Sequence, residues 1–247
     1  MKYQKKKDNK YLIFLDNNES VELYDDIILK YELLYNKILS KDKLDEIVND
    51  NKFYDLYYYA LNTLKRKNMS VYELRKSLFK NNYEDNDVEK VIDKLIKQGY
   101  LNDVLFSKSF INNKIVSTDY GPKKIESELL NKGIDKSIID NELEMFNFEV
   151  QNEKLNKLVK KSLSANHNKG GVVLKRKIIN FLISKGYDYD LCKSIVEKYD
   201  FSIDQELAKK EYEKLKKKYS SKYNDNMLLE NFLKKKLLER GLVYEEE

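Results

Sequence analysis

The sequence predicts an all-α fold of tandem three-helix repeats that form an elongated, curved array, with a small β-hairpin at the N-terminus. Three observations support this fold class. Apolar residues recur at helical spacing through most of the 247 residues. Glycine and proline, which punctuate turn-rich β folds, number only seven and one. From about residue 53 the apolar pattern repeats, as it does in arrays whose units bury their faces by stacking on one another.

The start of the chain follows a different pattern from the rest. β-prone runs at residues 10–15 and 19–24 flank the turn-forming sequence Asp16-Asn17-Asn18, so we expect a hairpin. Over residues 25–38 the apolar period becomes helical, and two aspartates at its start favour a helix N-terminus. A further helix is expected over residues 41–50. Together these elements form an N-terminal module ahead of the repeats.

Four segments share the same apolar columns. In each segment apolar residues stand at offsets 0, 4, 5 and 9, and successive segments begin 51, 53 and 55 residues apart. The position before the last column is asparagine once and glycine three times, and both types tolerate the left-handed conformation that ends many helices. The segments begin at Leu74, Ile125, Ile178 and Leu233, and their helix-ending residues are Asn82, Gly133, Gly186 and Gly241. The residues that we expect to form the repeated core and its helix ends include Leu74, Leu78, Ile125, Leu129, Gly133, Ile178, Leu182 and Gly186.

Each shared segment belongs to a larger unit of about three helices. Another helix is predicted ahead of every segment, at residues 53–67, 103–116, 153–165 and 205–219. A third helix follows the first three segments, whereas the fourth copy is truncated before it. The predicted domains are an N-terminal module (1–52), three repeats (53–103, 104–150 and 151–202) and a partial fourth repeat (203–247).

The sequence holds few residues suited to catalysis or metal binding. The one histidine, His167, has no cysteine or clustered carboxylate partners for a zinc site and no neighbouring nucleophile. The one cysteine, Cys192, stands in an apolar column, so we interpret it as a small buried side chain. Glycine-rich phosphate-binding motifs are absent from the sequence. We therefore expect no catalytic residue, no metal site and no cofactor.

Composition also bears on the cellular compartment. The longest apolar run, Leu56 to Leu61, has six residues, far fewer than the ~20 that a membrane-spanning helix needs. A single cysteine excludes an internal disulfide framework, which is typical of proteins in a reducing compartment. We expect a cytoplasmic protein that does not associate with a membrane.

Basic residues gather in the C-terminal part of the chain. Residues 151–247 carry 22 Lys and Arg against 15 Asp and Glu, whereas residues 1–150 carry 25 against 27. Two interpretations remain open: a solvated lysine-rich surface, or a basic band that binds an anionic partner and on which Tyr212, Tyr219 and Tyr223 stack against bases. The candidate DNA-binding or partner-binding residues are Lys157, Lys160, Lys161, Lys175, Arg176, Lys177, Lys209, Lys210, Lys214, Lys217 and Lys218.

Three stretches in a fixed order resemble a known family. Residues 60–78 read A-L-x-x-L-x-x-K-x-x-S-x-x-E-L-x-x-x-L, and residues 99–110 read G-Y-L-N-D-x-x-F-x-x-x-F. Residues 120–134 follow with Y-G-P-x-x-I-x-x-x-L-x-x-K-G-I. This order resembles the RecX regulatory proteins, which modulate the RecA recombinase, most strongly over residues 53–145 and more weakly to residue 247. Lys67, Ser107 and Asn82 depart from that pattern, where arginine, alanine and glycine are usual.

The resemblance implies a function as well as a fold. It implies a non-enzymatic protein that binds the RecA nucleoprotein filament and inhibits its ATPase and strand-exchange activity, modulating homologous recombination, DNA repair and the SOS response. Direct but weaker contacts with single-stranded and double-stranded DNA are implied as well. We expect a monomer, because stacking within one chain covers its apolar faces. The main alternative is a general single-stranded nucleic-acid-binding repeat protein that acts without RecA. A helical-repeat scaffold for an unrelated protein, which binds neither DNA nor RecA, also stays open.

Overall fold

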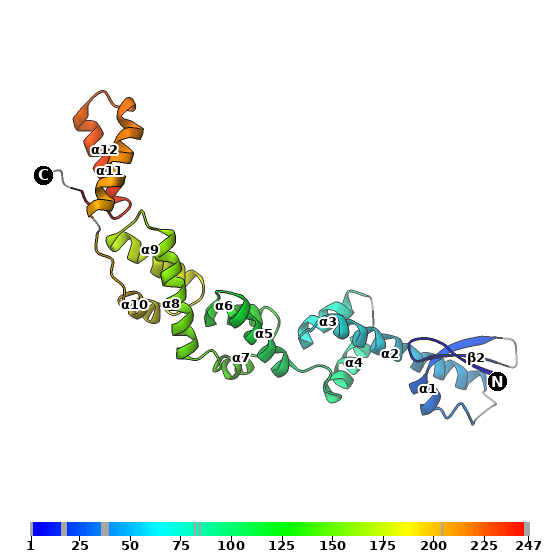
Figure 1. Cartoon of the computed structure of the whole chain (residues 1–247). Coiled ribbons are helices and arrows are strands. Elements are labelled where there is room, and N and C mark those ends of the chain that lie inside the picture. Colours follow the sequence, from blue (N-terminus) through cyan, green and yellow to red (C-terminus); the bar gives the residue numbers. More distant parts are fainter. Residues whose placement is uncertain are drawn as a thin grey trace. The chain divides into compact units, whose positions relative to one another are not determined.

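The computed structural model describes residues 2–15, 19–35, 40–81, 83, 85–203 and 205–244. The chain forms two compact units, and Figure 1 shows the succession of their elements along the chain. The first unit contains residues Met1–Phe106 and Lys132–Ile134. The second contains Ser107–Asn131 and Asp135–Glu247.

A three-stranded antiparallel sheet opens the first unit. Strand β1 (Lys2–Lys5) pairs with β2 (Lys10–Phe14), which pairs with β3 (Ser20–Tyr24). The predicted hairpin is therefore confirmed as β2 and β3 and is enlarged by one edge strand. The sequence Asp16-Asn17-Asn18 lies outside the described residues. A tight turn joins β1 to β2 with two residues in the left-handed region, a conformation that aspartate and asparagine tolerate.

The helix that follows β3 is shorter than the sequence predicts. Helix α1 spans Asp25–Lys30, and the chain then turns through Glu32, whose φ is 49°. The backbone N–H of Leu33 donates to the carbonyl of Ile28 over 3.0 Å, and the side chain of Leu33 is fully buried beside Ile28. Ending the helix early thus places Leu33 in the core, a gain that apolar spacing alone does not reveal.

Two predicted helices are one continuous helix. Helix α2 spans Lys41–Arg66 and begins at Ser40, whose side chain accepts a hydrogen bond from the backbone N–H of Lys43. The predicted module boundary after residue 52 therefore lies within a helix. Asn51, near its middle, is buried because its side chain accepts from the N–H of Tyr24 (3.0 Å) and donates to the carbonyl of Glu22 (3.3 Å). These bonds attach α2 to β3.

The remaining helices follow the three-helix pattern. After α2 come α3 and α4, and two further triplets and a final pair complete the described chain (Figure 1). Their bounds are α3 Val71–Phe79, α4 Asp85–Lys97, α5 Asp103–Ser117, α6 Pro122–Leu130, α7 Lys136–Leu143, α8 Phe148–Ala165, α9 Gly171–Ser184, α10 Tyr189–Val196, α11 Gln205–Tyr219, the short 3-10 helix Ser220–Lys222 and α12 Asn226–Leu238. The predicted all-α repeat fold with a small N-terminal sheet is confirmed, while the curvature of the array remains a prediction.

Two of the four predicted columns lie in the core of every repeat. All residues at offsets 0 and 4 are buried, including Leu74, Ile125, Leu129, Ile178 and Leu182. The column at offset 9 is buried in the last three repeats. The column at offset 5 is exposed throughout, because one helical position further on turns the side chain away from the core. Its members are Phe79 (38% exposed), Leu130 (46%), Ile183 (38%) and Leu238 (59%).

The helix-ending glycines lie at a contact that recurs between neighbouring three-helix repeats. The φ angles of Gly133, Gly186 and Gly241 are 72°, 95° and 73°, as their position in the repeat predicts. Asn82, the other predicted helix-ending residue, lies outside the described residues. In the second unit, the N–H of Gly121 at the start of α6 donates to the carbonyl of Lys185 over 2.7 Å. The contact supplies an acceptor for a backbone N–H that a helix start leaves unpaired.

The same contact recurs at two other places, once with a backbone N–H donor and once with a side-chain hydroxyl donor. In the second unit, the N–H of Gly170, which precedes α9, donates to the carbonyl of Arg240 over 3.1 Å. In the first unit, the hydroxyl of Ser70 donates to the carbonyl of Lys132 over 2.6 Å. Thus the start of the second helix in one repeat meets the residue before the helix-ending glycine in the next.

Candidate nucleic-acid interface

All eleven candidate basic residues belong to α8, α9 and α11 of the second unit. Three of them have carboxylate partners: Lys157 with Glu153 (2.5 Å), Lys175 with Glu197 (3.5 Å) and Lys214 with Glu211 (3.6 Å). The others make no ion pair with a residue that the structure describes, and they are exposed cations available to an anionic partner. They are Lys160, Lys161, Arg176, Lys177, Lys209, Lys210, Lys217 and Lys218.

Part of this set surrounds a groove beside α8. Two adjoining cavities of about 250 and 320 Å³ share Asp119, Leu158 and Lys161 as lining residues. Lys157 lines one of them, and Lys177 lines the other. We call this the α8 groove and define it by Asp119, Lys157, Leu158, Lys161, Lys177 and Phe181. Its floor is apolar at Leu158 and Phe181. Its rim is cationic on balance, because three lysines face the one carboxylate of Asp119.

A half-buried lysine, Lys154, positions α8 in this groove. The ammonium group of Lys154 donates to the carbonyls of Ile115 and Thr118, the latter over 2.8 Å, at the C-terminal end of α5. Those carbonyls are unpaired acceptors that favour a cation. Burial lowers the pKa of Lys154. Because Lys157 and Lys161 follow at helical spacing, they lie on the same side of α8. Lys154 is not among the candidate basic residues, although its spacing from Lys157 and Lys161 identifies a common face.

Two cations act on Lys169: Lys177, and Arg240, which is also paired with Glu211. The proximity of the Lys177 ammonium group lowers the pKa of Lys169, and the charge of Arg240 acts in the same direction. Lys177 also donates to the side-chain oxygen of Asn166. An anion placed between Lys169 and Lys177 would relieve their repulsion, so this end of the α8 groove is a favourable place for a phosphate. Lys169 and Arg240 are not among the candidate basic residues, because the effect of Lys177 and Arg240 on Lys169 depends on tertiary packing.

Removing one of these charges gives a direct test. The substitution Lys177→Gln is expected to raise the pKa of Lys169 towards that of an ordinary lysine, because the nearest like charge is lost. NMR titration of the lysine side-chain amines measures the effect. Lys175→Gln is the matched control, because that ammonium group is paired with Glu197. An unchanged pKa of Lys169 in the Lys177 variant would contradict the proposed proximity.

The lysines of α11 form a separate group. Lys210, Lys214 and Lys217 follow helical spacing along one side of that helix. No described contact joins them to the α8 groove, so one continuous basic band remains a prediction. The expected stacking of Tyr212 on bases is wrong: it is 4% exposed, its ring packs against Tyr244, and its hydroxyl donates to Glu230.

The two other tyrosines are also engaged in packing. The rings of Tyr219 and Tyr223 both contact Phe232, with centroids 4.9 and 5.2 Å away. Both side chains are half-buried, so each offers a nucleic acid only part of its surface. The exposed cations, rather than these rings, are therefore the stronger basis for an interface.

The two residues considered for catalysis have structural surroundings. His167 is exposed, and its Nδ1 lies 3.4 Å from the carbonyl oxygen of Ser164. Cys192 is buried, and burial raises the pKa of its thiol to about 11, which favours the unreactive protonated form. Among the described residues, no three His, Cys, Asp or Glu side chains gather in a metal-binding arrangement. In the same part of the chain, no helix is long and apolar enough to cross a membrane.

Comparison with known proteins decides the family. Models of the first, second and third three-helix domains of RecX match residues 57–95, 102–143 and 149–196. The protein named "Regulatory protein RecX" from Streptococcus agalactiae serotype Ia is 31% identical over 98% of this chain and 94% of its own length. The chain belongs to the RecX family. A RecX protein from Streptococcus thermophilus is 32% identical over 96% of this chain and 92% of its own length.

Solved structures support the same fold. A crystal structure of a regulatory protein RecX matches with a TM-score of 0.70 and 24% identity, covering 79% of this chain and 97% of that one. RecX from Lactobacillus salivarius matches with a TM-score of 0.57 and 27% identity, covering 59% and 95%. The α8 and α9 cations lie within the third RecX domain, whereas the lysines of α11 lie beyond all three family models.

Proposed function

We propose that this RecX-family chain regulates the RecA recombinase in the cytoplasm. It binds the RecA nucleoprotein filament as a monomer and inhibits ATP hydrolysis and strand exchange, without catalysing a reaction of its own. The observation that carries this proposal is the relationship to proteins named regulatory protein RecX over nearly the whole chain. Regulation of RecA is what the resemblance to this family implies.

The repeated architecture fits a periodic partner. A RecA filament presents equivalent protomers along its length, and tandem units present several contacts within one chain. Once one unit is bound, the others experience a high effective concentration of their sites, so weak individual contacts give tight overall binding. This mechanism requires no catalytic group.

The exposed cations supply the electrostatic part of the proposal. Lys161, Arg176 and Lys177, with the lysines of α11, contact DNA phosphates or an acidic surface of RecA. If about six phosphates of a single strand are neutralised, the logarithm of the binding constant falls with a slope of about -4 against the logarithm of salt concentration. A slope near zero in the ternary complex would contradict this role.

Titration into a RecA ATPase assay tests the proposal. The rate of DNA-dependent ATP hydrolysis is expected to fall as the protein is added. Inhibition well below one copy per RecA indicates capping or disassembly of filaments, whereas a near-stoichiometric requirement indicates occupation of the filament groove. An ATPase rate that never changes would contradict the proposed function.

Charge reversal tests the basic residues in that assay. The double variant Lys161→Glu and Lys177→Glu is expected to weaken inhibition about tenfold or more at low salt, because two phosphate contacts are replaced by repulsion. The matched control reverses Lys193 and Lys198, two exposed lysines outside the candidate set. Equal inhibition by both variants would assign the effect to net charge rather than to the α8 groove.

The alternative function is general single-stranded nucleic-acid binding without RecA. The cationic rim and apolar floor of the α8 groove favour it, since phosphates and bases offer matching chemistry. Fluorescence anisotropy with labelled single-stranded DNA separates the two functions. Full affinity in the absence of RecA supports the alternative, whereas a strong requirement for RecA supports the regulator.

A further inference from the structure

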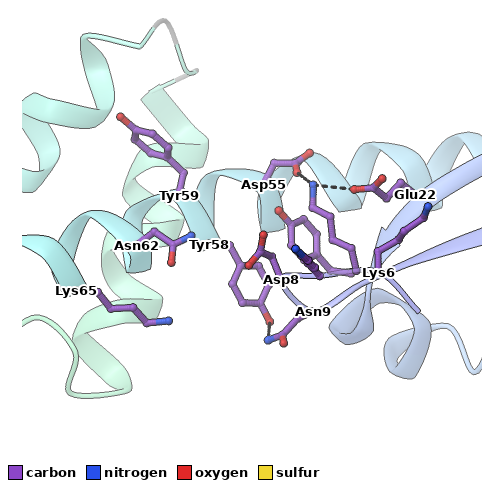
Figure 2. A pocket seen from close by; sticks show the side chains of 12 residues that line it. Lys6, Asp8, Asn9, Glu22, Asp55, Tyr58, Tyr59, Asn62 and Lys65 are labelled. Carbon is purple, nitrogen blue, oxygen red and sulfur yellow. Dashed lines mark hydrogen bonds and ion pairs between the residues drawn. The ribbon is translucent and has the colours of Figure 1, made fainter. Parts of the chain in front are cut away.

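The first unit contains a pocket far along the chain from the candidate basic residues. It has a volume of about 710 Å³ and lies between the β1–β2 turn and helix α2. Figure 2 shows Asn62 and Lys65 on one side of Tyr58, with Lys6 and the turn residue Asn9 on the other. We call it the α2 pocket. Its residues belong to a part of the chain whose net charge gave no reason to expect an anion site.

The turn beside the α2 pocket is fixed in place. The carbonyl of Asn9 accepts from the N–H of Asp25 over 2.9 Å, and its side-chain amide donates to the hydroxyl of Tyr58 over 3.3 Å. The φ angles of Asp8 and Asn9 are 58° and 62°, which define a tight two-residue turn. The turn therefore holds the adjacent Lys6 and Lys7 next to α2.

Charges within the pocket are only partly neutralised. The ammonium group of Lys10 lies 3.3 Å from a carboxylate oxygen of Glu22 and equally far from one of Asp55, so these carboxylates have a cation already (Figure 2). Lys6, Lys7 and Lys65 also line the pocket, and they are exposed and have no ion pair with any described residue. Asp8 is the one acidic lining residue that Lys10 does not contact. Lys10 brings one positive charge to two carboxylates, so the lining residues carry four lysines against three acids, a net charge of +1.

The lining residues extend along a helix face rather than gathering at one point, with Lys65 on α2 and Lys6 and Lys7 beside the β1–β2 turn. Asp55, Tyr59, Asn62 and Lys65 follow helical spacing, so they lie along one side of α2. Ten residues of α helix from Asp55 to Lys65 extend about 15 Å. This length suits an extended anion better than a single phosphate. Along this face lie the exposed amide of Asn62 and the ring of Tyr59, which is 37% exposed.

We propose that the α2 pocket binds a segment of single-stranded nucleic acid. The phosphates contact Lys6, Lys7 and Lys65, while a base lies against Tyr59 and forms hydrogen bonds with Asn62. Lysines that follow the backbone and an aromatic ring beside them are the combination that single-strand binding surfaces use. This site goes beyond the proposed function, which assigns nucleic acid to α8, α9 and α11 alone.

The test is binding of the full-length chain to a labelled oligothymidylate, followed by fluorescence anisotropy over a range of salt concentrations. The triple variant Lys6→Glu, Lys7→Glu and Lys65→Glu is expected to bind about tenfold more weakly at low salt, and its salt slope flattens by about 2. The matched control reverses Lys2, Lys52 and Lys97, exposed lysines of the same unit that do not line the pocket. Equal weakening in both triple variants would overturn the proposal.

A second pair of variants separates a nucleic-acid site from a general anion site. Tyr59→Leu and Asn62→Ala keep the charge of the pocket and are expected to weaken oligothymidylate binding several-fold, while inorganic polyphosphate binding stays unchanged. Equal losses for both ligands, or no loss for either, would overturn recognition of a base. Circular dichroism confirms that each variant is folded. Because these measurements omit RecA, their failure leaves the ATPase result intact, and an inactive ATPase titration leaves this site intact.

Discussion

Replacing Gly186 with alanine is expected to lower the free energy of unfolding of the second unit by about 3 kcal/mol, the sum of left-handed backbone strain and overpacking. The φ of Gly186 is 95°, a region that side chains with a Cβ disfavour. An added Cβ would lie 2.6 Å from the backbone nitrogen of Lys124 and 2.7 Å from its Cβ. These atoms belong to α6 and have no flexible end that can move aside.

The matched control for this prediction is Gly99→Ala. Gly99 has a φ of 75°, but nothing lies within 4 Å of the Cβ that alanine would add. It therefore carries the backbone strain without the close contact, and we expect a loss of about 1 kcal/mol. Urea unfolding followed by circular dichroism at 222 nm (the helix band) measures both. Equal losses at Gly99 and Gly186 would contradict the importance of the contact with α6.

The helix-ending glycines show what local pattern can predict. A residue that ends a helix in the left-handed region must adopt a positive φ, and glycine does so without steric cost because it lacks a Cβ. The sequence alone therefore locates Gly133, Gly186 and Gly241. The residue that each helix end contacts cannot be predicted in this way. That Gly121 donates to Lys185 depends on how two helical units stack, and no spacing within either unit specifies it.

The predicted boundaries of the first two helices differ from the observed ones for a related reason. Apolar spacing predicts a helix over residues 25–38 and another over residues 41–50. It carries no information about the side-chain contacts that join these helices to the sheet. Burial of Leu33 ends α1 early, and the two hydrogen bonds of Asn51 allow α2 to continue past the expected break. The sequence does not predict strand β1, because Lys2–Lys5 contains one apolar residue, Tyr3, as suits a solvated edge strand.

Prediction of the candidate interface was limited in the same way. Runs of lysine in the sequence correctly locate exposed cations on α8, α9 and α11, because charged side chains remain at the surface. The sequence does not reveal that Lys154 is used to hold the end of α5, or that Lys169 lies close to Lys177. Averaging charge over residues 1–150 also hides the cations of the α2 pocket, since acids elsewhere balance them.

Two adjacent leucines on α6 distinguish the core column from the exposed column. Leu129 is fully buried, whereas Leu130 is 46% exposed. The substitution Leu129→Ala is expected to lower the free energy of unfolding by about 3 kcal/mol, because buried methyl groups are lost and a cavity is left. Leu130→Ala is expected to cost under about 1 kcal/mol, since its side chain loses little buried area. Both values are measurable by urea unfolding of the full-length chain.

The comparison is controlled internally, because both variants make the same chemical change in the same helix. Leu237 and Leu238 of α12 repeat it independently, with exposed fractions of 1% and 59%. The buried member of each pair should be the more destabilising. If Leu130→Ala destabilised as much as Leu129→Ala, the offset-5 column would be part of the packed core. A different result would point to the filament. If Leu130→Ala weakened inhibition of RecA and Leu129→Ala did not, the exposed offset-5 column would be a contact surface for the filament.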